Sequence, residues 1–570
     1  MNLNTLLKDY EQNHLRDSSH VSNNCTLTLT SFDIKELPGV VLGFSCLVNL
    51  SLDHNELHSL PLDMCDRLMN LHRMSLNDNR VASLPRNLGN LKNLVELLAR
   101  KNYLQELPIS ICQLVRLEKL NLSCNEIMCI PDNFNCLQNL RELYLDENNL
   151  QSLPDSFGHL RNLEVLEASK NVITELPETF GYLVKLRTLK LNDNNISELP
   201  NSFSYLPSLE DLDLSYNHLT TLPETLASAE LIVKLVLDYN HICSLPVWFN
   251  CMTNVEELST KGNNINGDPF LDDFSIKCSK LKHFDFSGNN IETLPSTFGF
   301  IKKVEFIDMG SHLFQLQQNR NLKNGNLLKS LPSGFGNLHH LTELHLDENH
   351  LECLPETFGN LKNLELLDLS NNILTHLPDS FCHLESLRIC MLSINYLKFI
   401  PVNFGLLQCL EDLRLDNNQL LELPESFNNL QALKSLDLYN NKLIAFPLSL
   451  LNLTSLNKLD LEKNNFGLSV NELPNTSFKA PSDLTAPLLK HNWKADGIEF
   501  EAEERRMNGE VHESPYSLRR LESALAVGAS LWYSNGQKRS RIKATSQAVN
   551  SRKVSFEEFT DRNENDEISS

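Results

Sequence analysis

Carboxylate and tyrosine side chains recur at regular places along most of this chain. Asp213, Asp285, Asp368 and Asp437 each stand between two apolar residues, and Asp347 directly follows such a pair. Carboxylates attract basic surfaces, and tyrosines provide rigid contacts that are partly apolar. We therefore predict that a partner protein binds a surface made of Tyr144, Asp213, Tyr216, Asp238, Tyr239, Asp285, Asp347, Asp368, Asp437 and Tyr439. The alternative is that these positions are solvated and simply accept any polar residue.

The C-terminal region carries a different signal. Arg552-Lys553-Val554-Ser555-Phe556 resembles the docking motif of protein phosphatase 1 regulators, with basic residues before it and acidic residues after it. In that motif an extended peptide adds to a sheet edge while Val554 and Phe556 enter apolar pockets. We predict docking through Arg552, Lys553, Val554 and Phe556. Ser555 is a candidate phosphorylation site, and a phosphate there would oppose docking by its charge. A chance match to a short motif is the alternative.

Motifs of common enzymes are missing from the sequence. It contains no G-x-x-x-x-G-K-[ST] loop, no G-x-G-x-x-G turn, no H-E-x-x-H helix and no paired C-x-x-C. His339-His340 is an isolated pair that we interpret as solvated. We therefore expect that the chain is not an enzyme, needs no cofactor and has no metal site.

The residues that could bind a partner are placed by an internal repeat. Leu-Pro pairs recur every 23 residues from Pro131 to Pro154 and Pro177, and the same spacing holds from Pro332 to Pro355. Each unit follows the pattern L-x-x-L-x-L-x-x-N-x-L-x-x-L-P-x-x-F-G-x-L. The L-x-L portion alternates with period two, which predicts a short strand with one face buried. The Asn amide can bond backbone groups where the chain leaves the strand.

This unit is typical of leucine-rich repeats, and the chain is identified as a member of that class. The resemblance implies an α/β solenoid, namely a horseshoe with a parallel β-sheet on the concave face. Loops and short helical or extended turns would form the convex face, where the phenylalanines should stack. Some nineteen strands at about 4.8 Å spacing would give an inner arc on the order of 90 Å. The C-terminal tail is polar with segregated charge blocks, which predicts that it is largely disordered.

The spacing also divides the chain into segments. We predict a capping helix over 1–24, a first repeat run over 25–262 and irregular repeats over 263–331. A second run would cover 332–470, and a C-terminal cap 471–500. The irregular part contains an insertion of 14 residues near 312–325, because one Pro-to-Pro step there is 37 instead of 23. We interpret it as a solvated loop, with a partner-binding loop or a gene-model error as alternatives. The tail, 501–570, would contain an amphipathic helix at 515–533 and the docking motif at 552–556.

The LP-x-x-F-G form of the repeat resembles intracellular Ras-group scaffolds. That resemblance covers residues 25–470 and implies protein partners, including the phosphatase 1 catalytic subunit and a small GTPase or another client. Our first hypothesis is a scaffold that holds a client on the concave face and recruits the phosphatase through the tail. The alternatives are a plain structural adaptor of cytoskeleton, cilium or cortex, and a regulator of Ras-type GTPase signalling.

Composition limits the setting in which the chain works. Its 50 Lys and Arg against 73 Asp and Glu give a net charge of −23, which disfavours nucleic acid as a partner. The 14 cysteines occupy scattered apolar positions, which indicates reduced thiols and a cytoplasmic location. The basic run at 538–543 leaves nuclear import open. No apolar stretch is long enough for a signal peptide or a membrane span. We expect a monomer.

Overall fold

The computed structural model describes residues 5, 7, 8, 25–311 and 325–466. Residues 5, 7 and 8 are helical, and the Leu7 side chain is buried as part of the hydrophobic core. The predictions for 471–500, for the tail and for the helix at 515–533 lie outside the described residues.

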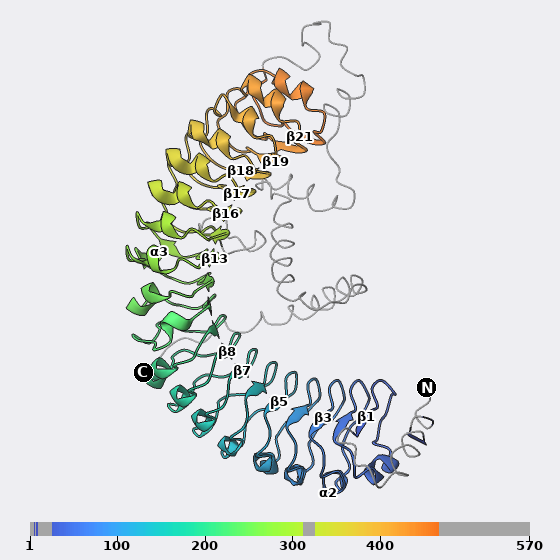
Figure 1. Ribbon diagram of the computed structural model, residues 1–570. Helices are drawn as coiled ribbons and strands as arrows, with labels where there is room; N and C mark the ends of the chain where they lie inside the picture. Colours follow the sequence, from blue (N-terminus) through green and yellow to red (C-terminus); the bar gives the residue numbers. More distant parts are fainter. Residues whose placement is uncertain (1–4, 6, 9–24, 312–324, 467–570) are drawn as a thin grey trace, which may run out of the picture. The chain divides into compact units, whose positions relative to one another are not determined.

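Each repeat contributes one short strand to a single parallel sheet of 19 strands. In chain order the strands are β1 (Thr26–Thr28), β2 (Asn49–Ser51), β3 (Arg73–Ser75), β4 (Glu96–Leu98), β5 (Lys119–Asn121), β6 (Glu142–Tyr144), β7 (Val165–Glu167), β8 (Thr188–Lys190), β9 (Asp211–Asp213), β10 (Lys234–Val236), β11 (Glu257–Ser259), β13 (His283–Asp285), β15 (Phe306–Asp308), β16 (Glu343–His345), β17 (Leu366–Asp368), β18 (Ile389–Met391), β19 (Asp412–Arg414), β20 (Ser435–Asp437) and β21 (Lys458–Asp460). The array curves, and the strands lie on its concave side (Figure 1).

Every strand of this 19-stranded sheet has three residues, and the middle one faces the core. Leu143 in β6 and Leu413 in β19, for example, are fully buried. Middle residues of neighbouring strands are in register, as Leu143 is with Leu166 of β7. Because side chains alternate along a strand, the first and third residues of each strand face away from the core. We call these the first and third positions.

A ladder of buried asparagines joins consecutive repeats. Asn148 donates from Nδ2 to the carbonyls of Leu122 and Leu145, at 3.0 Å each. Its Oδ1 accepts the backbone N–H of Ile127 at 3.0 Å. The residue before the ladder asparagine has a positive φ in most repeats, as in Glu147 (55°). Left-handed backbone is costly for side-chain-bearing residues, so the ladder bonds hold each turn in a conformation it would otherwise avoid.

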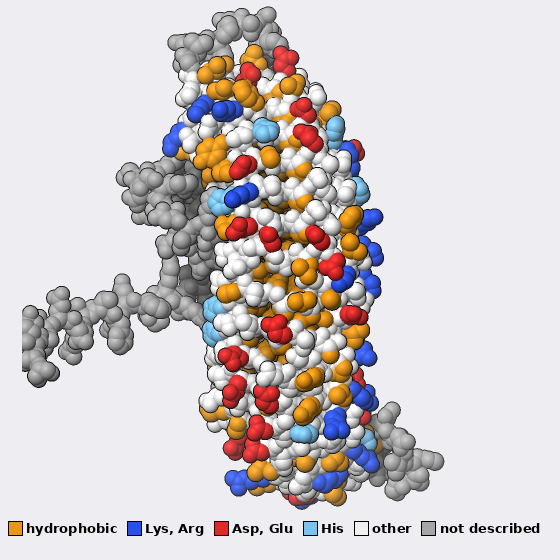
Figure 2. Space-filling view, turned by 90° about the vertical axis from the view of Figure 1, so that its left-hand side faces the viewer, with side chains coloured by type: hydrophobic (Ala, Val, Ile, Leu, Met, Phe, Trp, Pro, Cys, Tyr) orange, Lys and Arg blue, Asp and Glu red, His pale blue; other side chains and the backbone are white. Residues whose placement is uncertain are grey.

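Short helices cover the convex face, and most are 3-10 turns that follow the Leu-Pro pair. The 3-10 helices are η1 (Gly39–Gly43), η2 (Leu88–Asn90), η3 (Ile109–Gln113), η4 (Phe134–Cys136), η5 (Phe157–His159), η6 (Phe180–Tyr182), η7 (Asn201–Tyr205), η8 (Ala229–Leu231), η9 (Val247–Cys251), η10 (Phe298–Phe300), η12 (Ser333–Asn337), η13 (Glu356–Asn360), η14 (Asp379–His383), η15 (Phe404–Leu406), η16 (Glu425–Asn429) and η17 (Leu448–Asn452). Two single α-turns are α2 (Met64–Arg67) and α3 (Phe274–Lys277). Figure 2 shows this face, where apolar and charged side chains are interspersed.

Phenylalanines follow most of the repeat prolines and stack beneath these helices, as the sequence predicts. Ring centroids of Phe157 and Phe180 lie 6.3 Å apart and those of Phe358 and Phe381 lie 6.1 Å apart, with nearly parallel planes. The glycine that follows allows the next helix to approach closely. A Cβ at Gly359 would overlap the backbone carbonyl of Ser380, so this position accepts no side chain.

The sheet continues without a break through the irregular repeats. Phe306 of β15 pairs with Glu343 of β16 although 37 residues separate them. The ladder asparagine of this repeat is Asn326, which still bonds the carbonyls of Phe286 (2.8 Å) and Met309 (3.0 Å). The loop predicted at 312–325 lies, apart from Gly325, outside the described residues, and the repeats on either side of it keep their register. A second, two-stranded parallel sheet of β12 (Asn266–Gly267) and β14 (Asn290–Ile291) forms nearby.

Candidate functional site

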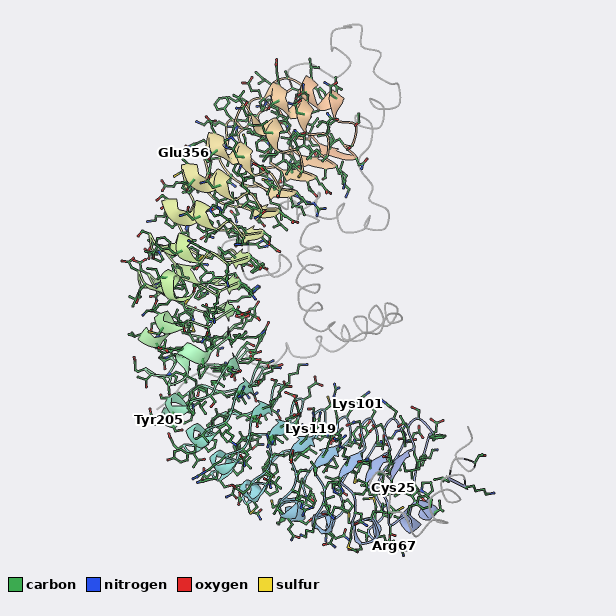
Figure 3. All side chains as sticks on the ribbon, in the orientation of Figure 1. Cys25, Arg67, Lys101, Lys119, Tyr205 and Glu356 are labelled. Atoms are coloured by element: carbon green, nitrogen blue, oxygen red, sulfur yellow. The ribbon has the colours of Figure 1, made fainter. Side chains whose placement is uncertain are left out.

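The concave sheet face and the turns that follow it hold every candidate partner-binding residue of the repeats. Tyr144, Asp213, Asp285, Asp368 and Asp437 occupy third positions. Tyr216, Asp238, Tyr239, Asp347 and Tyr439 lie in the turns just after their strands. The strand register places these residues along the array instead of gathering them in one pocket. In Figure 3, Lys119, a first-position residue, lies on the inner side and Tyr205 on the outer side.

Aspartates at third positions are held by their own turns. Oδ1 of Asp213 accepts the backbone N–H of Ser215 at 3.0 Å, and Oδ1 of Asp437 accepts that of Tyr439 at 3.0 Å. Asp285 and Asp368 make the same bond to Ser287 and Ser370. This local turn bond explains why aspartate recurs here, and it leaves the second carboxylate oxygen for other contacts. Asp213 and Asp437 are half-buried, whereas Asp285 and Asp368 are each only 8% exposed.

Aspartates in the following turns instead connect neighbouring repeats. Asp238 accepts the backbone N–H of Lys261 at 2.9 Å and the hydroxyl of Ser259 at 2.5 Å. Burial, and next the nearby carboxylate of Asp285, raise the pKa of Asp238 to about 7. Burial and the neighbouring Asp308 likewise raise the pKa of Asp285. These acids therefore combine a structural role with an accumulation of negative charge.

Tyr216 and Tyr239 form a stacked pair on the turns after β9 and β10. Their ring centroids are 4.5 Å apart, and the ring planes differ by 22°. Both residues have a positive φ, 53° and 52°, so the repeat turn itself brings the rings together. Burial raises the pKa of each phenol to about 12, so both remain protonated at neutral pH. Tyr216 is 53% exposed, and the pair offers an aromatic surface for contact.

The other two tyrosines contact lysines. The Lys119 ammonium lies 5.2 Å from the centroid of Tyr144, whose hydroxyl donates to Glu142 at 3.0 Å. The Lys463 ammonium lies 5.0 Å from the centroid of Tyr439. Both rings therefore already take part in cation–π contacts within the array.

First positions contain a row of residues that we did not predict from the sequence. The rings of His283 and Phe306 stack with centroids 4.2 Å apart. Glu343 of β16 follows Phe306 at the next first position. Beyond it, Leu366 of β17 and Ile389 of β18 are directly paired and half-buried. The sequence does contain a signal for these residues, because each of them directly precedes the buried middle residue of its strand.

Charges on the concave face are arranged differently in its two parts. From β5 to β11, lysines pair with glutamates on adjacent strands: Lys119 with Glu142 at 2.6 Å, Lys190 with Glu167 at 2.7 Å, and Lys234 with Glu257 at 2.7 Å. From β13 to β21, third positions instead carry five aspartates and one arginine, namely Asp285, Asp308, Asp368, Asp437, Asp460 and Arg414. Negative charge is therefore concentrated toward the C-terminal part of the sheet.

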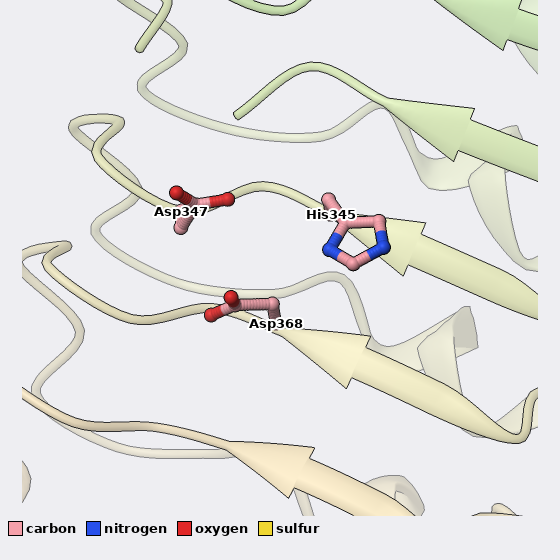
Figure 4. A group of neighbouring side chains, drawn as sticks. All are labelled: His345, Asp347 and Asp368. Atoms are coloured by element: carbon pink, nitrogen blue, oxygen red, sulfur yellow. The ribbon is translucent and has the colours of Figure 1, made fainter. Parts of the chain in front are cut away.

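One group of side chains within this part has the composition of a metal-ligand set. Ligand atoms of His345, Asp347 and Asp368 lie within 4.8 Å of one another (Figure 4). Asp347 accepts the backbone N–H of Ser311 at 3.3 Å, and Nε2 of His345 lies 2.7 Å from Glu343. Since these bonds already orient the side chains, we interpret the group as buried polar residues of the acidic part of the sheet.

The predicted phosphatase motif, Arg552, Lys553, Val554 and Phe556, and the phosphorylation candidate Ser555 lie outside the described residues. None of the helices that the structure describes combines the length and the apolar character needed to cross a membrane.

Family models match the repeats directly. One described as leucine rich repeat matches residues 92–150, 115–173, 138–196, 173–219 and 185–242. A leucine-rich repeat region matches 311–419, and a further leucine rich repeat matches 280–301. Rat (Rattus norvegicus) osteomodulin is 31% identical over 103 residues, which is 17% of this chain and 24% of osteomodulin. The chain thus spans only about a quarter of the length of that relative.

Solved structures show the same architecture. A TDR receptor has a TM-score of 0.58 at 26% identity, covering 77% of this chain and 84% of the receptor. The plant peptide hormone receptor RGFR1 in complex with RGF2 has a TM-score of 0.55 at 28% identity, covering 77% and 78%. The HAESA ectodomain from Arabidopsis, in complex with an IDA peptide hormone ligand, has a TM-score of 0.55 at 25% identity, covering 77% and 82%. With its asparagine ladder, phenylalanine stack and single parallel sheet, this chain is a leucine-rich repeat protein.

Proposed function

We propose that this protein is a non-enzymatic scaffold that binds a client protein on its concave face and recruits protein phosphatase 1 through residues 552–556. The proposal that a client binds the concave face rests on the composition of the sheet. Its buried leucines and ladder asparagines maintain the fold, while first and third positions and the turn residues Tyr216 and Tyr239 are not needed for the core. Leucine-rich repeat proteins generally act as binding scaffolds of this kind.

Related structures support a protein client. Two of the similar structures, RGFR1 and HAESA, are complexes with peptide hormones. By analogy, a protein segment could lie along the repeats of this chain. A small GTPase or another signalling protein is the type of client that we propose, in the cytoplasm, where the thiols would stay reduced.

Phosphatase recruitment would work through effective concentration. A phosphatase tethered by the tail would meet a client held on the array at a raised local concentration, without any catalytic residue of this chain. The support is the sequence of Arg552-Lys553-Val554-Ser555-Phe556, in which Val554 and Phe556 are spaced to enter two pockets while the peptide pairs as a strand.

The client site is tested with a double variant, Tyr216→Ala with Tyr239→Ala, in the full chain. The matched control is Tyr182→Ala with Tyr205→Ala, which removes two exposed tyrosines from neighbouring repeats of the convex face. Proteins crosslinked to each variant in cell extract are quantified against the wild type. We expect the concave variant to lose a specific set of partners that the control retains. Equal retention by both variants would exclude the tyrosine pair as a client contact.

Phosphatase docking is tested by calorimetry with a 535–570 peptide and the phosphatase 1 catalytic subunit. We expect micromolar or tighter binding that is lost in a Val554→Ala, Phe556→Ala peptide, because both anchors are removed. A Ser555→Glu peptide should bind more weakly because it adds negative charge within the motif. If the unchanged peptide does not bind, the proposal that the tail recruits the phosphatase is wrong. The proposal of a client site on the concave face would be unaffected.

A further inference from the structure

Carboxylates bracket a small apolar surface on the C-terminal part of the concave face. Leu366 of β17 pairs with Ile389 of β18 at first positions, and Asp368 pairs with Met391 at third positions. The third-position row then continues from Met391 to Arg414, Asp437 and Asp460. We call Leu366, Asp368, Ile389, Met391, Asp437 and Asp460 the C-terminal concave patch. All but Asp368 are half-buried.

The aspartates of this patch lack the ion pairs with Lys or Arg that many other acidic residues of the array make. Asp368, Asp437 and Asp460 form no ion pair within 4.0 Å with any Lys or Arg of the described residues. Each uses one oxygen to accept a backbone N–H two residues ahead, at 2.9–3.0 Å. By contrast, acids just before the strands are paired, as Glu411 is with both Arg388 (2.9 Å) and Lys434 (2.6 Å).

One arginine, Arg414, lies at the third position between Met391 and Asp437 and offsets part of the negative charge of the three aspartates. Arg414 lies among the patch acids, and burial lowers its pKa while Asp412 and Asp437 act against that effect. Lys463 lies over the Tyr439 ring. Burial, and next the neighbouring Asp416, raise the pKa of Asp437 to about 7. A cation brought close to this carboxylate would favour its charged form.

We infer that the C-terminal concave patch binds an extended basic segment of a partner protein, with aliphatic side chains on Leu366, Ile389 and Met391 and Lys or Arg side chains on the carboxylates. The inference rests on the proposed function and adds the chemistry of its client. The five strands from β17 to β21 span about 19 Å at about 4.8 Å per strand, and an extended chain covers that distance with about six residues. A short linear segment is therefore long enough to reach both the apolar pair and Asp460.

The probe is an acetylated and amidated nine-residue peptide in which lysines alternate with leucine and serine, and binding to the full chain is measured by fluorescence anisotropy at pH 8. The key variants are Asp437→Asn and Ile389→Thr. Their matched controls are Asp213→Asn, a third-position aspartate with the same turn bond, and Val165→Thr, an apolar first-position residue. Asn keeps the oxygen that accepts the turn N–H, so the fold should be preserved in both aspartate variants.

We expect the probe to bind the wild type, and a peptide with glutamate in place of lysine not to bind. Asp437→Asn and Ile389→Thr should each weaken binding roughly threefold or more, while both controls remain within error, and added salt should weaken binding further. No binding of the basic probe, or equal losses in Asp437→Asn and Asp213→Asn, would overturn the inference. Client binding is tested separately, by crosslinking to the Tyr216→Ala, Tyr239→Ala variant. A negative result with the basic peptide would therefore contradict this inference but not the proposed client site.

Discussion

At the residue scale, the aspartates of the concave face differ in what their carboxylates hold. Asp213 and Asp437 close their own turns, whereas Asp238 bonds Ser259 and Lys261 of the next repeat. Asp213 and Asp437 can each be replaced by asparagine, which removes the charge but keeps the turn bond, because asparagine offers the same acceptor oxygen. The charge of Asp238, by contrast, affects the bonds that join two neighbouring repeats.

Asp238→Asn should reduce the pH dependence of stability. The pKa of Asp238 in the folded protein, about 7, lies above its ordinary value, so the folded state binds an extra proton between about pH 4 and 7. The stability contributed by this proton is fully present below the unfolded pKa and is lost as pH rises through 7. At pH 8 the variant should therefore be more stable than the wild type by about 1–2 kcal/mol, after allowance for solvent screening.

The measurement compares urea midpoints of wild type and Asp238→Asn at pH 5 and pH 8. We expect the difference between variant and wild type to be larger at pH 8 than at pH 5. The same difference at both pH values would show that Asp238 does not bind the extra proton.

The roles of these residues could be predicted from the sequence only in part. The repeat register was sufficient to assign Asp213, Asp437 and Tyr144 to the concave face, because alternation along a strand fixes the side that each residue faces. It could not predict that Tyr216 and Tyr239 stack, because that contact depends on left-handed turns in two successive repeats. It also missed His283 and Phe306, because aromatic residues next to a buried apolar residue, here Phe284 and Ile307, resemble core residues in sequence.

At the element scale, the phenylalanine stack is interrupted once in a regular repeat. Leu226 occupies the place that Phe203 and Phe249 hold in the repeats before and after it. A small apolar cavity lies there, lined by Phe203, Leu226, Trp248 and neighbouring leucines. Its lining therefore lacks some of the contacts that the other repeats make.

Leu226→Phe should fill this cavity and continue the stack. We expect a stabilisation of about 0.5–1.5 kcal/mol, seen as a higher midpoint of urea unfolding. Leu226→Ala enlarges the same cavity and should destabilise by about 2–4 kcal/mol. A destabilised Leu226→Phe protein would mean that the surrounding side chains cannot move enough to admit the ring.

Asn372→Ala tests the asparagine ladder. The side chain bonds Leu346 O at 2.9 Å, Leu369 O at 3.1 Å and Leu351 N at 2.9 Å, and removing it leaves buried backbone groups without partners. We expect a loss of about 3 kcal/mol in unfolding free energy. Asn360→Ala, on the exposed surface of η13, is the control and should change stability by less than about 0.5 kcal/mol. Equal effects would contradict a special role for the ladder.

Most elements could be predicted because one unit repeats many times. The strands, the parallel sheet and the phenylalanine stack follow from the spacing of Leu, Asn, Pro and Phe. The choice of 3-10 over α-helix on the convex face could not be predicted, because these turns are too short for a helical period to appear. The pairing of β12 with β14 depends on the longer repeat at 257–283 and left no strand-like pattern in the sequence.

At the scale of the whole molecule, the array accepts added length without losing its register. Gly310 and Ser311 leave β15, and Gly325 and Asn326 rejoin the next ladder position. Gly310 and Gly325 both lie against the turn at Asp347 and Glu348, where an added Cβ would collide. The insertion is therefore attached at two closely packed points.

Deleting residues 312–325 should restore a regular repeat. Asn326 would then follow Met309 by three residues, as Asn349 follows Leu346. Because the free energy of closing a connection changes only slowly with its length, we expect the deletion to change stability by no more than about 1 kcal/mol. Circular dichroism and urea unfolding measure the result. Deleting 372–385, which has the same length but contains Asn372 and Phe381, should unfold the neighbouring repeats, and tolerance of both deletions would refute this account.

The two layers of the array have different natural spacings. Stacked rings such as Phe157 and Phe180 are 6.3 Å apart, whereas parallel strands are about 4.8 Å apart, and this mismatch bends the array toward the strands (Figure 1). The outer layer thus sets the curvature of the concave face, on which we propose that a client binds. A substitution that makes the outer layer thinner or thicker would change the curvature of the concave face. It would thereby change the affinity for a partner that contacts none of the substituted residues.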